Sequence, residues 1–228
     1  MRERPILFSA PMIRALIDGR KTQTRRVAKF TDAGYLKEPC GHRRWHRGDP
    51  DAVQACPFGG IGDRLWVRET WQHAPQDRCD CPQPSEPSPC DDWSNGTGCR
   101  SNRGEVLYRA DVGNETEERS VVRLAHRHGT HVAPWRPSIH MPRWASRITL
   151  KVTGVKIERL RDIGEEDAKA EGIRETLGGW WSAVENYPPL AANSPIGAFY
   201  CLWTSINGAA SWEANPWVAA ISFERIKP

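Results

Sequence analysis

A lysine and a threonine that could cooperate in hydrolysis lie three residues apart, just after the first predicted helix. The segment Gly19-Arg20-Lys21-Thr22-Gln23-Thr24-Arg25-Arg26 is short, polar and dense in groups that bind anions or activate a hydroxyl. A lysine with a lowered pKa can take a proton from a hydroxyl and so make it a nucleophile. Because residues three apart on a regular strand face opposite ways, Lys21 and Thr24 can converge only if the chain turns or bulges after Gly19. The alternative is a solvated basic connector.

A carboxylate that could complete this pair is Glu171, at the end of a predicted acidic helix. That helix starts at Asp162 or Gly164, has acidic residues in its first turn, where the helix dipole favours them, and closes at Gly172. Glu171 could accept a proton, hold the lysine or bind an amino group of a substrate. A surface charge beside a helix-ending glycine is the alternative interpretation.

Four cysteines lie in a segment, residues 73–104, that is rich in proline and almost without aliphatic side chains. Such a segment cannot bury a core of its own, so we interpret it as an insertion. Four thiolates could bind structural zinc and order it. Only one residue separates the first two cysteines, fewer than is usual, and unligated thiols are the alternative. The candidate ligands are Cys79, Cys81, Cys90 and Cys99.

Arginines and tryptophans alternate in several predicted loops, a pattern that suits stacked bases and phosphates. Arginine side chains that simply cover indole rings are an equally good explanation. The residues expected to contact a substrate or a nucleic acid are Arg20, Arg25, Arg26, Glu69, Trp135, Arg136, Arg143 and Trp144.

Composition limits the class of protein. The chain has 228 residues, a net charge of +4 and eleven tryptophans, which together permit an anionic partner without requiring one. We find no secretory signal and no apolar run long enough to cross a membrane, so we expect a cytoplasmic protein with no membrane partner. Its cysteines are then better interpreted as thiols or metal ligands than as disulfides.

The elements that must position these groups are mostly strands. We predict strands over 5–8, 64–71, 105–110, 148–160 and 217–226, with a short one at 120–125, helices over 9–18, about 164–172 and about 199–206, and loops over 29–57, 126–147 and 176–195. Gly154 interrupts the alternation of the 148–160 strand, which predicts a bulge. Strands without regular helical crossovers indicate an α+β fold with a small mixed β-barrel, flanking helices and long loop insertions.

Several of these segments resemble the ASCH domain. The resemblance lies in residues 19–26, in Gly62-Asp63-Arg64-Leu65, in the strand around Val152 and in the closing strand to Ile226. A wider pattern, including Trp135-Arg136-Pro137-Ser138, is similar to larger phage and prophage members. The resemblance covers nearly the whole chain apart from 73–104 and about 176–195. It implies one PUA-like domain over residues 1–228, with insertions at those two places.

The resemblance also implies an activity. Small bacterial members of this superfamily are N(4)-acetylcytidine amidohydrolases that use a lysine, a threonine and a glutamate, and Lys21, Thr24 and Glu171 match these three. The implied substrate is a modified nucleoside or nucleotide, hydrolysed without a catalytic cofactor. The family equally permits a module that binds RNA or single-stranded DNA, or a ribonuclease.

Overall fold

The computed structural model describes residues 1–28, 56, 58–74, 105–111, 123–126, 129–132, 135–176, 178–184 and 188–226. Its contacts divide the chain into two compact units. The first unit comprises Met1–Val67 and Ser146–Pro228, and the second is Arg68–Ala145. The second unit contains the insertion predicted at 73–104 and is longer than that insertion. Each unit is described by itself.

The first unit is built on a five-stranded sheet with the strand order β1-β3-β8-β12-β2. Its strands are β1 (Glu3–Leu7), β2 (Gln23–Val27), β3 (Arg64–Arg68), β8 (Thr149–Arg159) and β12 (Trp217–Ile226). The pairs β3–β8, β8–β12 and β12–β2 are antiparallel. The fold is therefore a mixed α/β fold, and among the described strands the sheet is not closed into a barrel.

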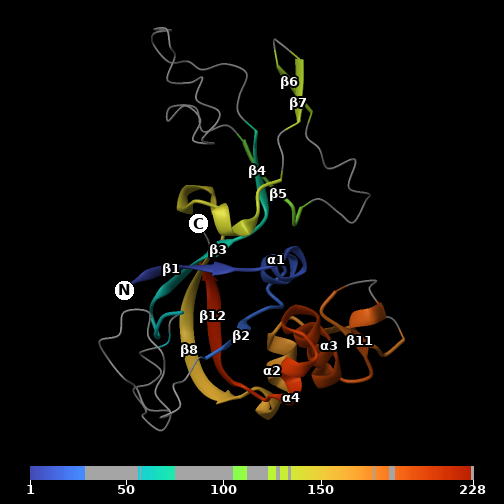
Figure 1. Cartoon of the computed structure of the whole chain (residues 1–228). Helices are drawn as coiled ribbons and strands as arrows, with labels where there is room; N and C mark the ends of the chain where they lie inside the picture. Colours follow the sequence, from blue (N-terminus) through green and yellow to red (C-terminus); the bar gives the residue numbers. More distant parts are fainter. Residues whose placement is uncertain are drawn as a thin grey trace. The chain divides into compact units, whose positions relative to one another are not determined.

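The two longest strands, β8 and β12, form the centre of the sheet and run side by side (Figure 1). Along β8 the side chains alternate between buried Leu150 and Val152 and exposed neighbours, which is the pattern of a strand with one face on the core. The register shifts between Ser222 and Phe223, which pair with Gly154 and Val152. The bulge predicted from Gly154 is confirmed.

Helix α1 (Ala10–Ile17) follows β1 and is confirmed nearly as predicted. Ser9 is its N-cap residue and Gly19 follows its end with φ of +75°, a conformation that favours glycine. Ile13 and Leu16 are buried as expected, whereas Ile17 is 39% exposed. The buried face of the helix is therefore narrower than its apolar residues would suggest.

Strand β2 was not predicted, because Gln-Thr-Arg-Arg contains no apolar residue to reveal the alternation. It pairs with β12, and Thr24 lies opposite Ile221. Thr24 and Arg25 are both buried, at 1% and 3% exposure. Polar partners, described below, make the burial of Arg25 tolerable.

Three further α-helices follow in the described part of the first unit, and α2 contacts both β2 and α3 (Figure 1). They are α2 (Glu165–Ala170), α3 (Pro195–Asn207) and α4 (Ala210–Glu213). The side chain of Ser194 caps α3 by accepting a hydrogen bond from the N–H of Gly197, and α3 ends at Gly208 as predicted. Buried Phe199 and Leu202 connect α3 to the apolar cluster around Leu160.

Residues 176–195 are not the plain loop that was predicted. They contribute β10 (Trp181–Ser182) and β11 (Ala191–Ala192) to a three-stranded sheet with β9 (Arg174–Glu175). Trp181 packs against the cluster around Leu160, and the hydroxyl of Ser182 donates to the carbonyl of Val184. These short strands carry too few residues for a periodic pattern.

The described residues of the second unit form two antiparallel strand pairs and two short 3-10 turns, Ser138–His140 and Arg143–Ala145. Strand β4 (Trp71–Ala74) pairs with β5 (Glu105–Tyr108), and β6 (Arg123–His126) pairs with β7 (Gly129–Val132). The strand predicted over 64–71 is thus two strands, and the predicted 126–147 loop includes β7. None of the helices in the described part of the chain has the length and apolar character that a bilayer crossing requires.

The turn before β3 provides a test of the fold through Asp63. Its carboxylate accepts hydrogen bonds from the N–H of Arg2, at 2.7 Å, and of Gly60, at 3.2 Å. Partial burial raises the pKa of Asp63, but these bonds and the nearby positive charges hold the pKa below its ordinary value of 3.8. The carboxylate therefore stabilises the fold above pH 3.8, and that contribution is lost as the pH falls through the lower folded pKa.

We expect Asp63→Asn to lower the free energy of unfolding by about 1 kcal/mol at pH 7 and by less at a pH below the folded pKa of Asp63. Urea unfolding at both pH values measures the effect, with the exposed Asp162→Asn as the control. An Asp63→Asn loss that is equal at both pH values would show that its charge is irrelevant.

Candidate active site

The turn that places Lys21 lies directly after α1. The N–H groups of Arg20 and Lys21 both donate to the carbonyl of Ala15, at 2.9 and 3.0 Å. The next residue is held from the other side, where the N–H of Thr22 donates to the carbonyl of Ala170 at 2.9 Å. The predicted turn after Gly19 is confirmed, and it directs Lys21 toward the end of α2.

Lys21 and Glu171 form a buried ion pair. The Lys21 ammonium donates to Oε2 of Glu171 at 2.6 Å and to the Glu171 backbone carbonyl at 2.8 Å. The two side chains are 0% and 4% exposed. Two of the three ammonium protons are thus held by one residue that lies 150 positions away in the sequence.

Burial lowers the pKa of Lys21 below its ordinary value of 10.5. The carboxylate of Glu171 opposes this shift, whereas the positive charges of Arg26 and Arg25 add to it. The net direction is downward, because the ammonium has lost its contact with solvent. A neutral amine is therefore reached at a lower pH than for an exposed lysine, which is what a general base requires.

Thr24 lies on β2 and lines the same pocket as Glu171. Its hydroxyl makes no hydrogen bond to another residue in the described part of the chain. The structure thus joins Lys21 to Glu171 by direct contact and places Thr24 and Glu171 on one pocket. A hydrogen bond between the Lys21 ammonium and the Thr24 hydroxyl is not present among these described residues.

The pocket is lined by both polar and apolar side chains. The polar lining residues are Thr24, Arg25, Arg26, Glu171 and Asn207, and the apolar ones are Met12, Val27, Phe199, Leu202, Trp203 and Ile206. Four of the apolar residues come from one face of α3. The sequence predicted this helix, over about 199–206, but did not indicate that it lines a pocket.

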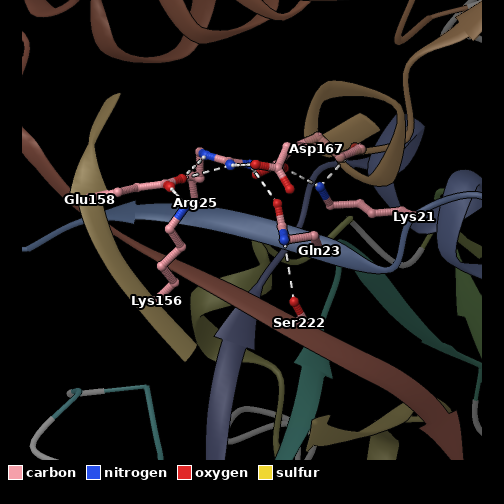
Figure 2. A network of polar contacts seen from close by, with 8 residues as sticks. Lys21, Gln23, Arg25, Lys156, Glu158, Asp167 and Ser222 are labelled. Atoms are coloured by element: carbon pink, nitrogen blue, oxygen red, sulfur yellow. Dashed lines mark hydrogen bonds and ion pairs between the residues drawn. The ribbon is translucent and has the colours of Figure 1, made fainter. Parts of the chain in front are cut away.

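Arg25, expected to contact a substrate, is instead occupied by protein groups. Its guanidinium donates to Glu158 Oε1 at 2.7 Å, to Asp167 Oδ2 at 2.8 Å and to Gln23 Oε1 at 2.6 Å. A further contact of 3.4 Å reaches Glu171 Oε1. Figure 2 shows Arg25 between Glu158 and Asp167. Arg25 also lines the pocket, so its predicted contact with a substrate or nucleic acid stays a prediction.

Two carboxylates of this network were missed from the sequence. Glu158 is 4% exposed on β8 and also pairs with Lys156 at 2.6 Å, while Asp167 comes from the first turn of α2. Gln23 is held in turn by a hydrogen bond to the Ser222 hydroxyl at 3.2 Å (Figure 2). Asp167 was missed because its carboxylate was explained by the helix dipole alone. Glu158 was missed because it lies near a lysine in a strand, where a charged residue normally faces solvent.

The other two arginines of the segment behave differently. Arg26 donates to the Leu7 carbonyl at 2.6 Å, stacks over the Phe8 ring at 5.3 Å and lines the pocket. Burial lowers its pKa, and Glu171 opposes that shift. Arg20 pairs with Asp18 at 2.9 Å and donates to the Gly172 carbonyl at 3.0 Å, so it fastens the turn to the end of α2.

The remaining predicted contacts belong to the second unit. Arg136 stacks on Trp71, with the guanidinium carbon 5.3 Å from the ring centre, and Trp144 meets Trp71 edge-on at 5.9 Å. Trp144 is 42% exposed. One face of Trp135 lies under Arg109, at 5.6 Å. At Trp71 and Trp135 the structure therefore shows the alternative explanation, in which an arginine side chain covers an indole ring.

Glu69, another predicted contact in that unit, is 2% exposed, and its N–H donates to Met141 Sδ at 3.3 Å. Arg143 lies in the 3-10 turn Arg143–Ala145. The proposed zinc ligands Cys79, Cys81, Cys90 and Cys99 lie outside the described residues, and within those residues no group of side chains could hold a metal ion. Structural zinc therefore stays a prediction.

Comparisons of the chain with protein-family models, curated proteins and solved structures returned no match. The resemblance to the ASCH family therefore rests on the sequence motifs named above and stays a prediction.

A substitution at Gly172 tests whether the turn after Gly19 must lie close to the end of α2. Its φ is +99°, and a Cβ atom there would lie 3.2 Å from Ala15 Cβ and 3.3 Å from Lys21 Cβ. We expect Gly172→Ala to lower the free energy of unfolding by about 2–3 kcal/mol, because backbone strain and crowding add.

Gly19→Ala is the matched control. Gly19 also has a positive φ, of +75°, but a Cβ atom added to it would meet no other atom within 4 Å. We expect this variant to lose about 1 kcal/mol through backbone strain alone. Urea unfolding compares the two variants, and equal losses would mean that the close approach at Gly172 contributes nothing.

Proposed function

We propose that the protein is a hydrolase that cleaves the amide bond of N(4)-acylated cytosine nucleosides or nucleotides. The observation that carries the proposal is the buried Lys21–Glu171 pair, whose carboxylate shares a pocket with the Thr24 hydroxyl. Lysine, hydroxyl and carboxylate are the groups that the resemblance to amidohydrolases requires. The contact of Lys21 with Glu171, and the pocket that Glu171 shares with Thr24, support the proposal, because Glu171 is far from the other two in the sequence. Lys21 itself is not among the residues that line this pocket.

In the proposed reaction the neutral Lys21 amine takes the proton of the Thr24 hydroxyl or of a water molecule. The deprotonated oxygen attacks the acyl carbonyl carbon, and the carbon–nitrogen bond then breaks as Lys21 returns the proton to the departing N4 amine. If Thr24 attacks, water hydrolyses the resulting ester. Acid and cytosine product leave, and no cofactor is consumed.

Glu171 has the second role. Its Oε2 atom holds the Lys21 ammonium, which fixes the amine in place. A carboxylate in the pocket wall also suits the N4 amino group, which carries a hydrogen-bond donor. We therefore assign to Glu171 both the orientation of Lys21 and recognition of the nucleobase amine.

The PUA-like barrel is part of the same proposal. The bulged β8–β12 pair, flanked by β3 and β2, supports it, although the described strands form an open sheet. A second candidate function, binding of RNA or single-stranded DNA, is favoured by one observation, the 42% exposure of Trp144 in a basic 3-10 turn. Exposed aromatic rings stack on unpaired bases.

The hydrolase proposal predicts that the Thr24 hydroxyl is essential. We expect Thr24→Val, which preserves shape, to reduce kcat/KM for N(4)-acetylcytidine by at least about a hundredfold. Thr22→Val is the control, because Thr22 is two residues away on the same segment and exposed. Loss of the acyl absorbance is followed with acylated cytosine, cytidine and deoxycytidine.

Thermal unfolding by circular dichroism establishes that both variants are folded. Equal turnover by Thr24→Val and Thr22→Val would remove Thr24 from the reaction. Absence of turnover by the unmodified protein with all three substrates, together with salt-sensitive binding of single-stranded RNA, would replace the hydrolase by the nucleic-acid-binding function.

A further inference from the structure

We infer that Arg25 is a positioning residue of this site, which holds the Glu171 carboxylate in place against Lys21 by dividing one guanidinium among three carboxylates. The inference rests on the proposed role of Lys21 as the base. It reassigns Arg25, which the sequence suggested as a contact for substrate or nucleic acid.

The two oxygens of Glu171 face two different cations. Oε2 accepts from Lys21 at 2.6 Å, and Oε1 lies 3.4 Å from Nη1 of Arg25. A carboxylate fixed at both oxygens has little freedom to rotate. Its orientation toward the Lys21 amine is therefore determined partly by where Arg25 lies.

Arg25 is itself fixed by groups from several elements. Its Nε and Nη2 atoms donate to Glu158 on β8 at 3.1 and 2.7 Å, and Nη2 also reaches Asp167 on α2 at 2.8 Å. Nη1 donates to Gln23, and the guanidinium carbon is 5.9 Å from the Phe199 ring centre on α3. A planar guanidinium can meet these acceptors at once, whereas a lysine ammonium at this position could not.

The charges of the network balance, with Lys21, Arg25 and Lys156 against three carboxylates. Lys21 is influenced by Glu171, Arg25 and Arg26. Removing Arg25 takes away a positive charge that opposes protonation of Lys21 and leaves Glu171 free to stabilise the ammonium fully. The amine then becomes neutral only at higher pH, and a reaction that needs the neutral amine loses rate first at low pH.

A pair of double variants isolates this effect. Arg25→Met alone would leave Glu158 buried without its main partner, so we combine it with Glu158→Gln. The control is Lys156→Met with Glu158→Gln, which removes the same carboxylate and one cation but keeps Arg25. Neither Glu158 nor Lys156 contacts Lys21 through a hydrogen bond or ion pair among the described residues. The two double variants have the same net charge.

The main readout is the pH profile of kcat/KM for N(4)-acetylcytidine. We expect the acid limb of Arg25→Met/Glu158→Gln to move to higher pH, with kcat/KM on that limb reduced on the order of tenfold and the alkaline plateau reduced less than about threefold. The control is expected to keep the parental limb. The inference would be overturned if the acid limb of kcat/KM lay at the same pH in both double variants. It would also be overturned if Arg25→Met/Glu158→Gln lost the same factor of kcat/KM at all pH values.

A second readout does not depend on turnover. Titration of the Lys21 side chain by NMR is expected to show a higher pKa in Arg25→Met/Glu158→Gln than in the control, and equal pKa values would overturn the inference. If the parent protein shows no turnover, the proposed function fails while this titration still decides the role of Arg25.

A conservative variant covers the case in which the first double variant does not fold. Arg25→Lys keeps the positive charge but cannot reach Glu158, Asp167 and Glu171 together. We expect the pKa of Lys21 in this variant to rise above the parental value, because Glu171 is then held by Lys21 alone. The rise is expected to be smaller than in the double variant. An unchanged Lys21 pKa in Arg25→Lys would likewise overturn the inference.

Discussion

The buried ion pair between Lys21 and Glu171 is the interaction on which the rest of the site depends. Removing an ammonium and a carboxylate from water costs several kcal/mol for each ion, and close contact offsets this only when the geometry is good. Here one residue supplies two acceptors to the ammonium, at 2.6 and 2.8 Å. The geometry requires the turn after Gly19 and the close approach at Gly172, so the backbone around the pair has little freedom.

Around this pair the protein balances charge and excludes water by different means. Arg25 links Glu171 to two further carboxylates, so its own buried charge is compensated by protein groups. Apolar side chains from α3 also line the pocket. Electrostatic effects are larger in such a place than in water, so small changes in the network alter when Lys21 is protonated.

Much of the frame could be predicted from the sequence, because it follows local rules. Gly19 after α1, the interruption at Gly154 and the end of α3 at Gly208 each depend on local backbone geometry that glycine permits. The contact of Lys21 with Glu171 was predicted by resemblance, not by periodicity. Strand β2 and the use of Arg25 could not be predicted, since burial of polar residues is decided by partners such as Glu158 that are distant in sequence.

A buried ion pair can often be replaced by apolar residues without loss of stability, so the pair is weak evidence for stability, and we propose a catalytic role for it. The most direct test is the rate at which Lys21→Met/Glu171→Met hydrolyses N(4)-acetylcytidine, with circular dichroism establishing that it is folded. We predict that the unmodified protein turns over this substrate and that the folded double variant retains less than about a hundredth of the parental rate. Comparable turnover by both proteins would contradict the assignment of the pair to catalysis.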